Sequence, residues 1–423
     1  MKIKTKKANY EEVMALQRPE HKRPYKPSKL LAAVMRIATS GDLKKVGFTY
    51  TKKNMERAGD GPWLILMNHS SFTDLEIVSK IMYPKTYSIV CTSDGFVGKE
   101  ELMRRLGCIP TQKFVTDVSL IADISYALKT NKTSVLMYPE ASYSFDGTAT
   151  PLPRHMGVFL KRMKVPVVMI TTYGSFARDP LYNNLQKRDV KVSAVMECLM
   201  TPEEIKAMSL DEIDAKLDEA FSFDYFKWQE DNHIVIDEPF RADSLNRILY
   251  KCACCGREGQ MEGKGTVLKC KACGKEYEMD ELGRLKAKDG ETDFSHIPDW
   301  YAWERKCVAE DIENGSYSLD TDVEIGLMVD FKAIYMVGEG TLHHDAKGFV
   351  LDGCDGKLHY EQGPKTCYSC YSDYYWYELG DIICIGNKDC LYYCFPKKED
   401  VVAKTRIAVE EIYKRSLDAV TSA

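Results

Sequence analysis

One strand-to-helix turn decides the fold, and it runs Trp63-Leu64-Ile65-Leu66-Met67-Asn68-His69-Ser70-Ser71-Phe72-Thr73-Asp74. Its first five residues are apolar and predict a short buried strand, and apolar residues then recur at helical spacing over 72–82. Five residues on a regular helix turn the chain by about 500°, so His69 and Asp74 can meet only through the turn before the helix. A hydroxyl nucleophile needs a nearby base with an anionic partner. The sequence predicts that His69 and Asp74 are this pair.

Apolar strands alternate with amphipathic helices on both sides of this turn. Strands are predicted at residues 63–67, 87–91, 134–138, 165–171 and 190–196. Helices are predicted between them at residues 74–82, 99–106, 118–129 and 156–163. This alternation predicts an α/β domain with a largely parallel sheet. A polar helical stretch follows at 202–248, so we assign residues 41–248 to this domain.

The first 60 residues carry an excess of positive charge. They contain 15 Lys and Arg against 6 Asp and Glu, a net charge of +9, whereas the whole chain has a net charge of -5. A basic segment before an acidic body is typical of contact with membrane head groups or nucleic acid. The acidic remainder disfavours nucleic acid. We predict a basic helical arm over residues 1–40, in which the apolar run at 30–35 lies either at a membrane surface or on the main domain.

Three further blocks accompany the His69 turn, and together they resemble the glycerolipid acyltransferase superfamily, typified by 1-acylglycerol-3-phosphate acyltransferases. The family's first block is Asn-His-x4-Asp, which Asn68, His69 and Asp74 match. The other blocks are matched by Gly107 with Lys113 six places on, by Tyr138-Pro139-Glu140-Ala141-Ser142-Tyr143, and by the apolar strand that contains Pro166. One His-x4-Asp is weak evidence, but four blocks in order are specific. The resemblance covers roughly residues 40–200.

The resemblance implies that His69 takes the proton of an acceptor hydroxyl as it attacks an acyl thioester, while Asp74 holds the imidazole. The donor would be acyl-CoA or acyl carrier protein, and the acceptor a lysolipid met at the membrane surface. Substrate contacts are implied for Gly107, Lys113, Glu140 and Arg154.

The chain departs from the family at two basic positions. Lys113 replaces an Arg and loses its bidentate fork, and Tyr143 replaces the Arg of the third block. Arg154 is a candidate to compensate. The favoured acceptor is 1-acylglycerol-3-phosphate, in phospholipid biosynthesis, with another hydroxyl or amine lipid left open. The alternative is a catalytically altered lipid-binding scaffold that recruits partners.

Residues 249–285 contain two Cys-x-x-Cys-Gly knuckles. Their four candidate ligands are Cys252, Cys255, Cys270 and Cys273, and Cys254 inside the first knuckle is not expected to bind. Two knuckles of this kind predict a zinc ribbon with a closed S4 site, so the metal would be structural rather than catalytic. Metal-ligand spacing favours a reducing cytoplasm over disulfides. No secretory signal is expected, so we predict a cytoplasmic protein, peripheral on the inner face of the membrane.

The remaining part, residues 300–423, is predicted to be β-rich and to end in a helix at about 399–416. Strands are predicted at 323–329, 333–337, 348–352, 374–379, 381–385 and 391–395. Strands that end in one helix are similar in architecture to pleckstrin-homology-like domains. Cys367, Cys370, Cys390 and Cys394 could hold a second metal, but Cys also fills β cores as a small apolar residue, and that interpretation is favoured.

Overall fold

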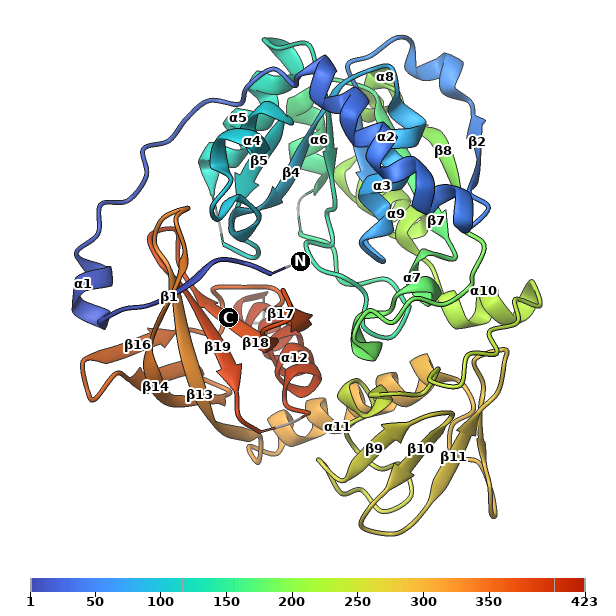
Figure 1. Ribbon diagram of the computed structural model, residues 1–423, viewed down its shortest axis with the longest axis vertical. Helices are drawn as coiled ribbons and strands as arrows, with labels where there is room; N and C mark the ends of the chain where they lie inside the picture. Colours follow the sequence, from blue (N-terminus) through green and yellow to red (C-terminus); the bar gives the residue numbers. More distant parts are fainter. Residues whose placement is uncertain (1, 116, 155, 399, 422–423) are drawn as a thin grey trace.

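The computed structural model describes residues 2–115, 117–154, 156–398 and 400–421. Within these residues the strands form three sheets: a seven-stranded mixed sheet, a four-stranded antiparallel sheet and a larger antiparallel sheet that contains the C-terminal strands. Figure 1 shows the first sheet with its helices above and the other two sheets below it. The predicted fold class, an α/β domain followed by a small cysteine-containing β unit and a β-rich unit with a final helix, is confirmed.

The seven-stranded sheet has the order β2-β8-β7-β3-β6-β4-β5. Its strands are β2 (Thr49–Lys53), β3 (Leu64–Met67), β4 (Tyr87–Thr92), β5 (Cys108–Thr111), β6 (Ser134–Met137), β7 (Val167–Tyr173) and β8 (Ser193–Met200). Every neighbouring pair is parallel except β7 and β8, which are antiparallel. The central position of β3 places the turn that follows it in the middle of one sheet edge.

Helices cover both faces of this sheet. They are α2 (Lys29–Lys45), α3 (Thr73–Met82), α4 (Glu100–Arg105), α5 (Val118–Lys129), α6 (Met156–Met163), α8 (Pro202–Ala207) and α9 (Leu210–Phe221). Two more helices, α7 (Ser175–Arg178) and α10 (Tyr225–Asp231), pack in the core that continues into the cysteine and C-terminal units. Successive side chains of a strand point to opposite faces. Ile65 and Met67 therefore join the core beneath α2 and α3, while Leu64 and Leu66 join the core beneath α5, α6 and α9. All four residues of β3 are fully buried, as its apolar run predicts.

The cysteine unit and the C-terminal unit are joined by a long helix, α11 (Ile297–Glu313), which the sequence analysis did not predict. The four-stranded sheet consists of β9 (Met261–Lys264), β10 (Val267–Cys270), β11 (Glu276–Met279) and β12 (Leu285–Ala287). The C-terminal strands are β13 (Ser318–Met328), β14 (Ile334–Asp345), β15 (Gly348–Gly353), β16 (Leu358–Gln362), β17 (Tyr371–Trp376), β18 (Gly380–Gly386) and β19 (Leu391–Pro396). The first of them, β13, pairs with the last, β19. The final helix is α12 (Val402–Thr421); residue 399, its predicted start, lies outside the described residues.

The N-terminal segment differs from the predicted basic helical arm over residues 1–40. Its helices are α1 (Tyr10–Met14) and α2, but β1 (Thr5–Lys7) is a strand that pairs in parallel with β14 of the C-terminal sheet. Arg18 Nε also donates to the carbonyl of Asp389, 2.9 Å away. The segment therefore runs from the C-terminal sheet to the seven-stranded sheet (Figure 1), and "helical arm" is wrong for its first residues. Among the described residues, no helix is long and apolar enough to cross a membrane.

Candidate active site

Three of the predicted site residues follow parallel strands of the seven-stranded sheet. His69 comes after β3, Glu140 after β6 and Lys113 after β5. Parallel strands present their carboxyl ends at one edge of a sheet, and ligands commonly bind outside that edge. The topology therefore brings these residues to one place, although they are far apart in sequence.

The turn after β3 joins His69 to Asp74. Nδ1 of His69 lies 3.0 Å from Oδ2 of Asp74, which also accepts the backbone N–H groups of Ser70 at 2.9 Å and Ser71 at 3.2 Å. The predicted contact is therefore present, and it is made by a turn that wraps around the carboxylate. Two backbone N–H donors on this oxygen favour the ionised carboxylate, and a carboxylate acceptor favours the imidazole tautomer that carries its proton on Nδ1.

Two tyrosines enclose the imidazole. The ring of Tyr138 lies 4.0 Å from that of His69 between centroids, and the ring of Tyr143 lies 3.9 Å from it, both stacked. The His69 side chain is 15% exposed, and its Nε2 has no hydrogen-bond partner among the described residues. Both faces of the ring and Nδ1 are occupied, so Nε2 is the atom left to react.

Burial sets the protonation of this pair. It lowers the pKa of His69 well below its ordinary value, and the charge of Lys113 acts in the same direction. Burial raises the pKa of Asp74 to about 7, which the N–H groups of Ser70 and Ser71 oppose. The imidazole is therefore neutral at neutral pH, as a general base must be.

Glu140 braces the turn from the neighbouring strand. Its Oε2 accepts the backbone N–H of His69 at 3.0 Å, and its Oε1 accepts the N–H and the hydroxyl of Thr150 at 2.9 and 3.0 Å. Burial raises the pKa of Glu140 to about 7, and the hydrogen bonds from Thr150 and His69 oppose the shift. Both carboxylate oxygens are thus used inside the protein, so Glu140 positions His69.

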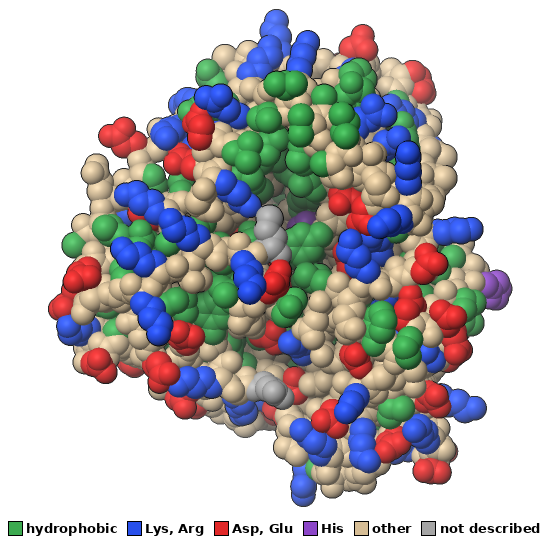
Figure 2. All heavy atoms as spheres, in the orientation of Figure 1, with side chains coloured by type: hydrophobic (Ala, Val, Ile, Leu, Met, Phe, Trp, Pro, Cys, Tyr) green, Lys and Arg blue, Asp and Glu red, His purple; other side chains and the backbone are tan. Residues whose placement is uncertain are grey.

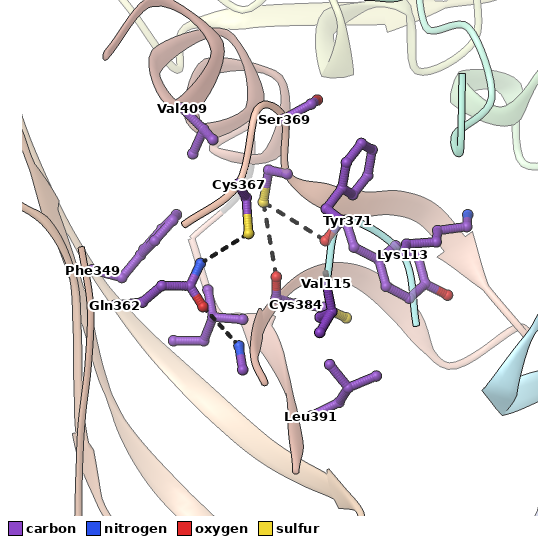
Figure 3. A pocket seen from close by; sticks show the side chains of 14 residues that line it. Lys113, Val115, Phe349, Gln362, Cys367, Ser369, Tyr371, Cys384, Leu391 and Val409 are labelled. Atoms are coloured by element: carbon purple, nitrogen blue, oxygen red, sulfur yellow. Dashed lines mark hydrogen bonds between the residues drawn. The ribbon is translucent and has the colours of Figure 1, made fainter. Parts of the chain in front are cut away.

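Lys113 meets the C-terminal unit at the same site. Its ammonium lies 4.4 Å from the ring centroid of Tyr371 on β17 and 5.8 Å from that of Tyr143. No carboxylate of the described residues lies within 4.0 Å of it. Burial lowers the pKa of Lys113, while Asp373 and Asp94 oppose that shift. Lys113 also lines the pocket drawn in Figure 3, whose other lining residues come mainly from the C-terminal unit, and its side chain points away from the sulfur atoms there.

The other two predicted substrate contacts, Gly107 and Arg154, share no hydrogen bond or ion pair with this group in the described residues. Gly107 sits in the α4–β5 turn at a φ of +93°, and a Cβ there would approach Pro27 Cγ to 2.5 Å and the Tyr87 carbonyl oxygen to 2.9 Å. Close backbone packing therefore accounts for this glycine. Arg154 is exposed before α6 and shares no hydrogen bond or ion pair with the other site residues that the structure describes.

Sequence reasoning missed the residues that the C-terminal half brings to the site. Tyr371 contacts Lys113, and Arg406 on α12 donates from Nη1 to the carbonyl of Tyr143 at 3.1 Å. Neither lies near a block, and no local pattern marks them. The stacking of Tyr143 on His69 was also missed, although the departure from Arg at this position was a signal.

The four predicted metal ligands converge. The sulfur atoms of Cys252, Cys255, Cys270 and Cys273 all lie within 4.8 Å of one another. Each knuckle turns through its glycine: the N–H of Gly256 bonds the carbonyl of Cys252 at 2.8 Å, and that of Gly274 bonds the carbonyl of Cys270 at 2.9 Å. Four thiols at this spacing fit a tetrahedral S4 metal site without an open position. Cys254 is not part of the group, as predicted.

The second cysteine set does not converge. Among the described residues, Cys367, Cys370, Cys390 and Cys394 form no group with metal-ligand geometry. Instead Cys367 accepts from Gln362 at 3.6 Å, and Cys370 donates to the carbonyls of Tyr371 at 3.7 Å and Cys384 at 4.0 Å (Figure 3). The favoured interpretation, cysteines as fillers of a β core, fits these contacts.

A family model and a solved structure are each similar to part of this chain. A solved structure titled 1-acyl-sn-glycerophosphate (LPA) acyltransferase, PlsC, from Thermotoga maritima is similar at 14% identity and a TM-score of 0.34, over 46% of this chain and 78% of that chain. That similarity is too low to carry an argument. Residues 48–173 match the family model described as Acyltransferase, and His69, Lys113, Glu140 and Pro166 all lie within this range. The resemblance drawn from the four blocks is therefore confirmed: residues 48–173 form an acyltransferase domain.

Proposed function

We propose that this protein transfers a fatty acyl group from acyl-CoA or acyl carrier protein to the hydroxyl of a lysophospholipid-like acceptor, with 1-acylglycerol-3-phosphate as the favoured acceptor. The observation that carries the proposal is the state of His69. Its imidazole is neutral, its Nδ1 is held by Asp74, and its Nε2 is free within the segment that matches the acyltransferase family.

The reaction follows from that geometry. Nε2 of His69 accepts the proton of the acceptor hydroxyl while the oxygen attacks the thioester carbonyl carbon. Asp74 stabilises the imidazolium that forms. The tetrahedral intermediate then collapses, the carbon–sulfur bond breaks, and the imidazolium returns the proton to the departing thiolate. The products are an ester and a free thiol.

Lys113 is the proposed contact for an anionic acceptor head group. Its ammonium has no carboxylate partner within 4.0 Å among the described residues, so its charge remains available. Tyr143 stands where a second cation is expected and covers the imidazole instead. The acceptor site therefore holds less positive charge than the family pattern, which makes head-group selectivity the property to measure.

The proposed membrane contact is the outer face of α2. Among the described residues of this helix, Leu43 alone is fully buried, whereas Leu30 and Ile37 are each 74% exposed and Val34 lies between them on the same face. Helix α3 packs beside α2, and Phe72 just before α3 and Leu75 within it are exposed three and six residues after His69. Figure 2 shows hydrophobic side chains gathered around a hollow in the upper half of this face of the molecule. An apolar face of this kind with basic residues at its edges suits the inner, anionic surface of a cytoplasmic membrane.

Zinc is the proposed occupant of the four-cysteine site. Four thiolates are soft ligands in a closed tetrahedral set, which zinc prefers. The ion would hold the β9–β12 unit together and take no part in acyl transfer.

The test uses the purified chain with labelled acyl-CoA or acyl-loaded carrier protein and three acceptors: 1-acylglycerol-3-phosphate, a zwitterionic lysophospholipid and a neutral monoacylglycerol. Transfer that His69→Ala abolishes supports the proposal, and the ratio among acceptors defines the head group. Absence of transfer to all three, with liposome binding intact, would overturn it. That result would favour the alternative, a lipid-binding scaffold, for which the Tyr143 ring stacked on His69 is the supporting observation.

A further inference from the structure

Helix α12 of the C-terminal unit places one buried arginine against the acyltransferase domain. Arg406 is 2% exposed, and its Nη1 donates to the carbonyl of Tyr143 at 3.1 Å. Its guanidinium carbon lies 3.9 Å from the centroid of the Phe145 ring, which is itself buried. Arg406 thus holds both residues that flank Ser144, from a helix 263 positions further along the chain.

The segment that Arg406 holds touches His69 in two ways. The ring of Tyr143 stacks on the imidazole with 3.9 Å between centroids, and the N–H of Ser144 donates to the carbonyl of His69 at 3.2 Å. A shift of this segment would therefore move the stacking partner and a backbone bond of His69 together.

The arginine is costly where it lies. Its Nε and Nη2 are buried without a hydrogen-bond partner, and no carboxylate of the described residues comes within 4.0 Å of its nitrogens. A buried cation without a carboxylate partner is strongly destabilising, as the effect of breaking buried ion pairs shows. Stability alone is a poor explanation for its presence, and its charge acts on the site instead. Burial raises the pKa of Glu140 to about 7, and the charge of Arg406 is among the groups that oppose that shift.

Other charged groups share this environment. The charge of Arg406 also opposes the burial that raises the pKa of Asp373, and it adds to the burial that lowers the pKa of Lys113. On its own helix Glu410 is engaged by Ser369 and by Arg305 of α11. Glu140 is the member of this set that bonds His69 directly, so the effect of Arg406 on the base runs through Glu140 and the Tyr143–Phe145 segment.

We infer that Arg406 is a positioning residue for His69, so that the C-terminal unit forms part of the acyltransferase site. The expected effect of Arg406 on kcat rests on the proposed function. Its positioning of His69 can be measured without acyl transfer.

The experiment compares Arg406→Gln and Arg406→Lys with Arg415→Gln. Arg415 is the matched control, because it lies on the same helix and its Nη2 also donates to a backbone carbonyl, that of Ala309 at 2.9 Å, but its side chain is 40% exposed. We expect Arg406→Gln to lower kcat about 30-fold with little change in KM, the scale of losing about 2 kcal/mol of positioning. The acid limb of its pH profile should also move to higher pH, because Glu140 loses a positive neighbour. Arg406→Lys should restore that limb and part of kcat.

The histidine ring NMR signals give a readout that does not need transfer, with His69 identified by the signal that His69→Ala removes. Arg406→Gln should shift that signal, and Arg415→Gln should leave it unchanged. A wild-type His69 signal and pH profile in Arg406→Gln would overturn the inference, as would equal losses of thermal stability and activity in Arg406→Gln and Arg415→Gln. If the wild type transfers no acyl group, the proposed function fails, while the His69 signal still decides the role of Arg406.

Discussion

The His69 turn and the four-cysteine site are both built from short motifs at tight turns, yet their polar atoms are used in opposite ways. In the turn after β3, Asp74 and Glu140 hold the imidazole nitrogen Nδ1 and the backbone of His69, and Nε2 is left without a partner among the described residues. In the cysteine site all four sulfur atoms point at one another within 4.8 Å. An open atom on a fixed scaffold is suited to chemistry, and a closed set of ligands is suited to holding structure. Substitutions at the His69 turn should therefore lower activity, whereas substitutions at the four-cysteine site should lower stability.

The largest effect is expected from His69→Ala. Removing the general base should lower kcat/KM by about 10³-fold. The thermal unfolding temperature should fall by no more than about 5 °C, because the removed ring makes one side-chain hydrogen bond and stacks on two tyrosines. Activity is measured with the labelled donor and stability by calorimetry. A large loss of stability together with residual acyl transfer would show that His69 has a structural role and is not the general base.

Cys270→Ser should have the opposite signature. Loss of one of four thiolates should remove the metal and lower the unfolding temperature by about 10 °C, since metal binding in such sites is folding free energy. Metal content by mass spectrometry should fall from about one zinc per chain to near zero. Cys254→Ser is the matched control in the same knuckle, and it should keep both the metal and the stability. Transfer that survives in the folded fraction of Cys270→Ser would confirm that the metal is not catalytic.

Much of both sites could be predicted from the sequence because each is local. His69 and Asp74 lie five residues apart, and each Cys-x-x-Cys-Gly knuckle places two thiols three residues apart, so the spacing marked these residues as candidates. The central strands of the seven-stranded sheet were also found, because strands buried on both faces are continuous apolar runs.

The missed elements have physical reasons. The edge strand β2 (Thr49–Lys53) is exposed along its whole length, and the other edge strand, β5, contains Pro110, which only an edge tolerates. Neither has the apolar run by which strands are recognised. The contacts of Lys113 with Tyr371 and of Tyr143 with Arg406 depend on how the C-terminal unit packs, which no local spacing encodes.

The pH dependence of transfer separates the roles of the groups in the open site. The pKa values of Asp74 and Glu140 are raised to about 7 by burial, whereas that of His69 is lowered well below its ordinary value. As the pH falls through 7, Asp74 and Glu140 therefore take up protons before the imidazole does. A protonated carboxyl group is a weaker acceptor for the N–H groups that hold His69 in place. We expect kcat/KM to decline below about pH 7.

The matched test of that decline is Glu140→Gln. An amide has one acceptor oxygen where the carboxylate has two, so it cannot accept the hydrogen bonds from both His69 and Thr150, and kcat/KM at pH 8 should fall about 10-fold. The decline of kcat/KM on acidification should become shallower, because one titrating group has been removed. Glu101→Gln, an exposed change on α4, should alter neither. A wild-type profile whose acid limb lies below pH 6 would contradict the assignment to the carboxylates.

The proposed acceptor is a lipid, so the proposed function requires the open site to reach a membrane surface, which the closed site need not do. Replacing Leu30 and Ile37 together by Glu should weaken binding to anionic vesicles about tenfold, because two exposed apolar side chains leave the interface and two negative charges enter it. Transfer to a water-soluble short-chain acceptor should remain near the wild-type value. Vesicle sedimentation measures the first effect. Unchanged sedimentation would place the membrane contact elsewhere on the molecule.

The smallest effect is expected where thiols are numerous but do not converge. Cys394 is fully buried in β19 and Cys367 accepts a hydrogen bond from Gln362, yet among the described residues neither belongs to a metal-ligand group. Cys394→Ala should cost about 1 kcal/mol as a small cavity, lowering the unfolding temperature by about 3 °C. Cys367→Ala should cost less, since its side chain is less enclosed. Zinc content should stay at the wild-type level in both, because the metal-ligand group found in the described part of the chain consists of Cys252, Cys255, Cys270 and Cys273. A drop in zinc content in either variant would show that Cys394 or Cys367 contributes to metal binding, although neither belongs to the four-cysteine group.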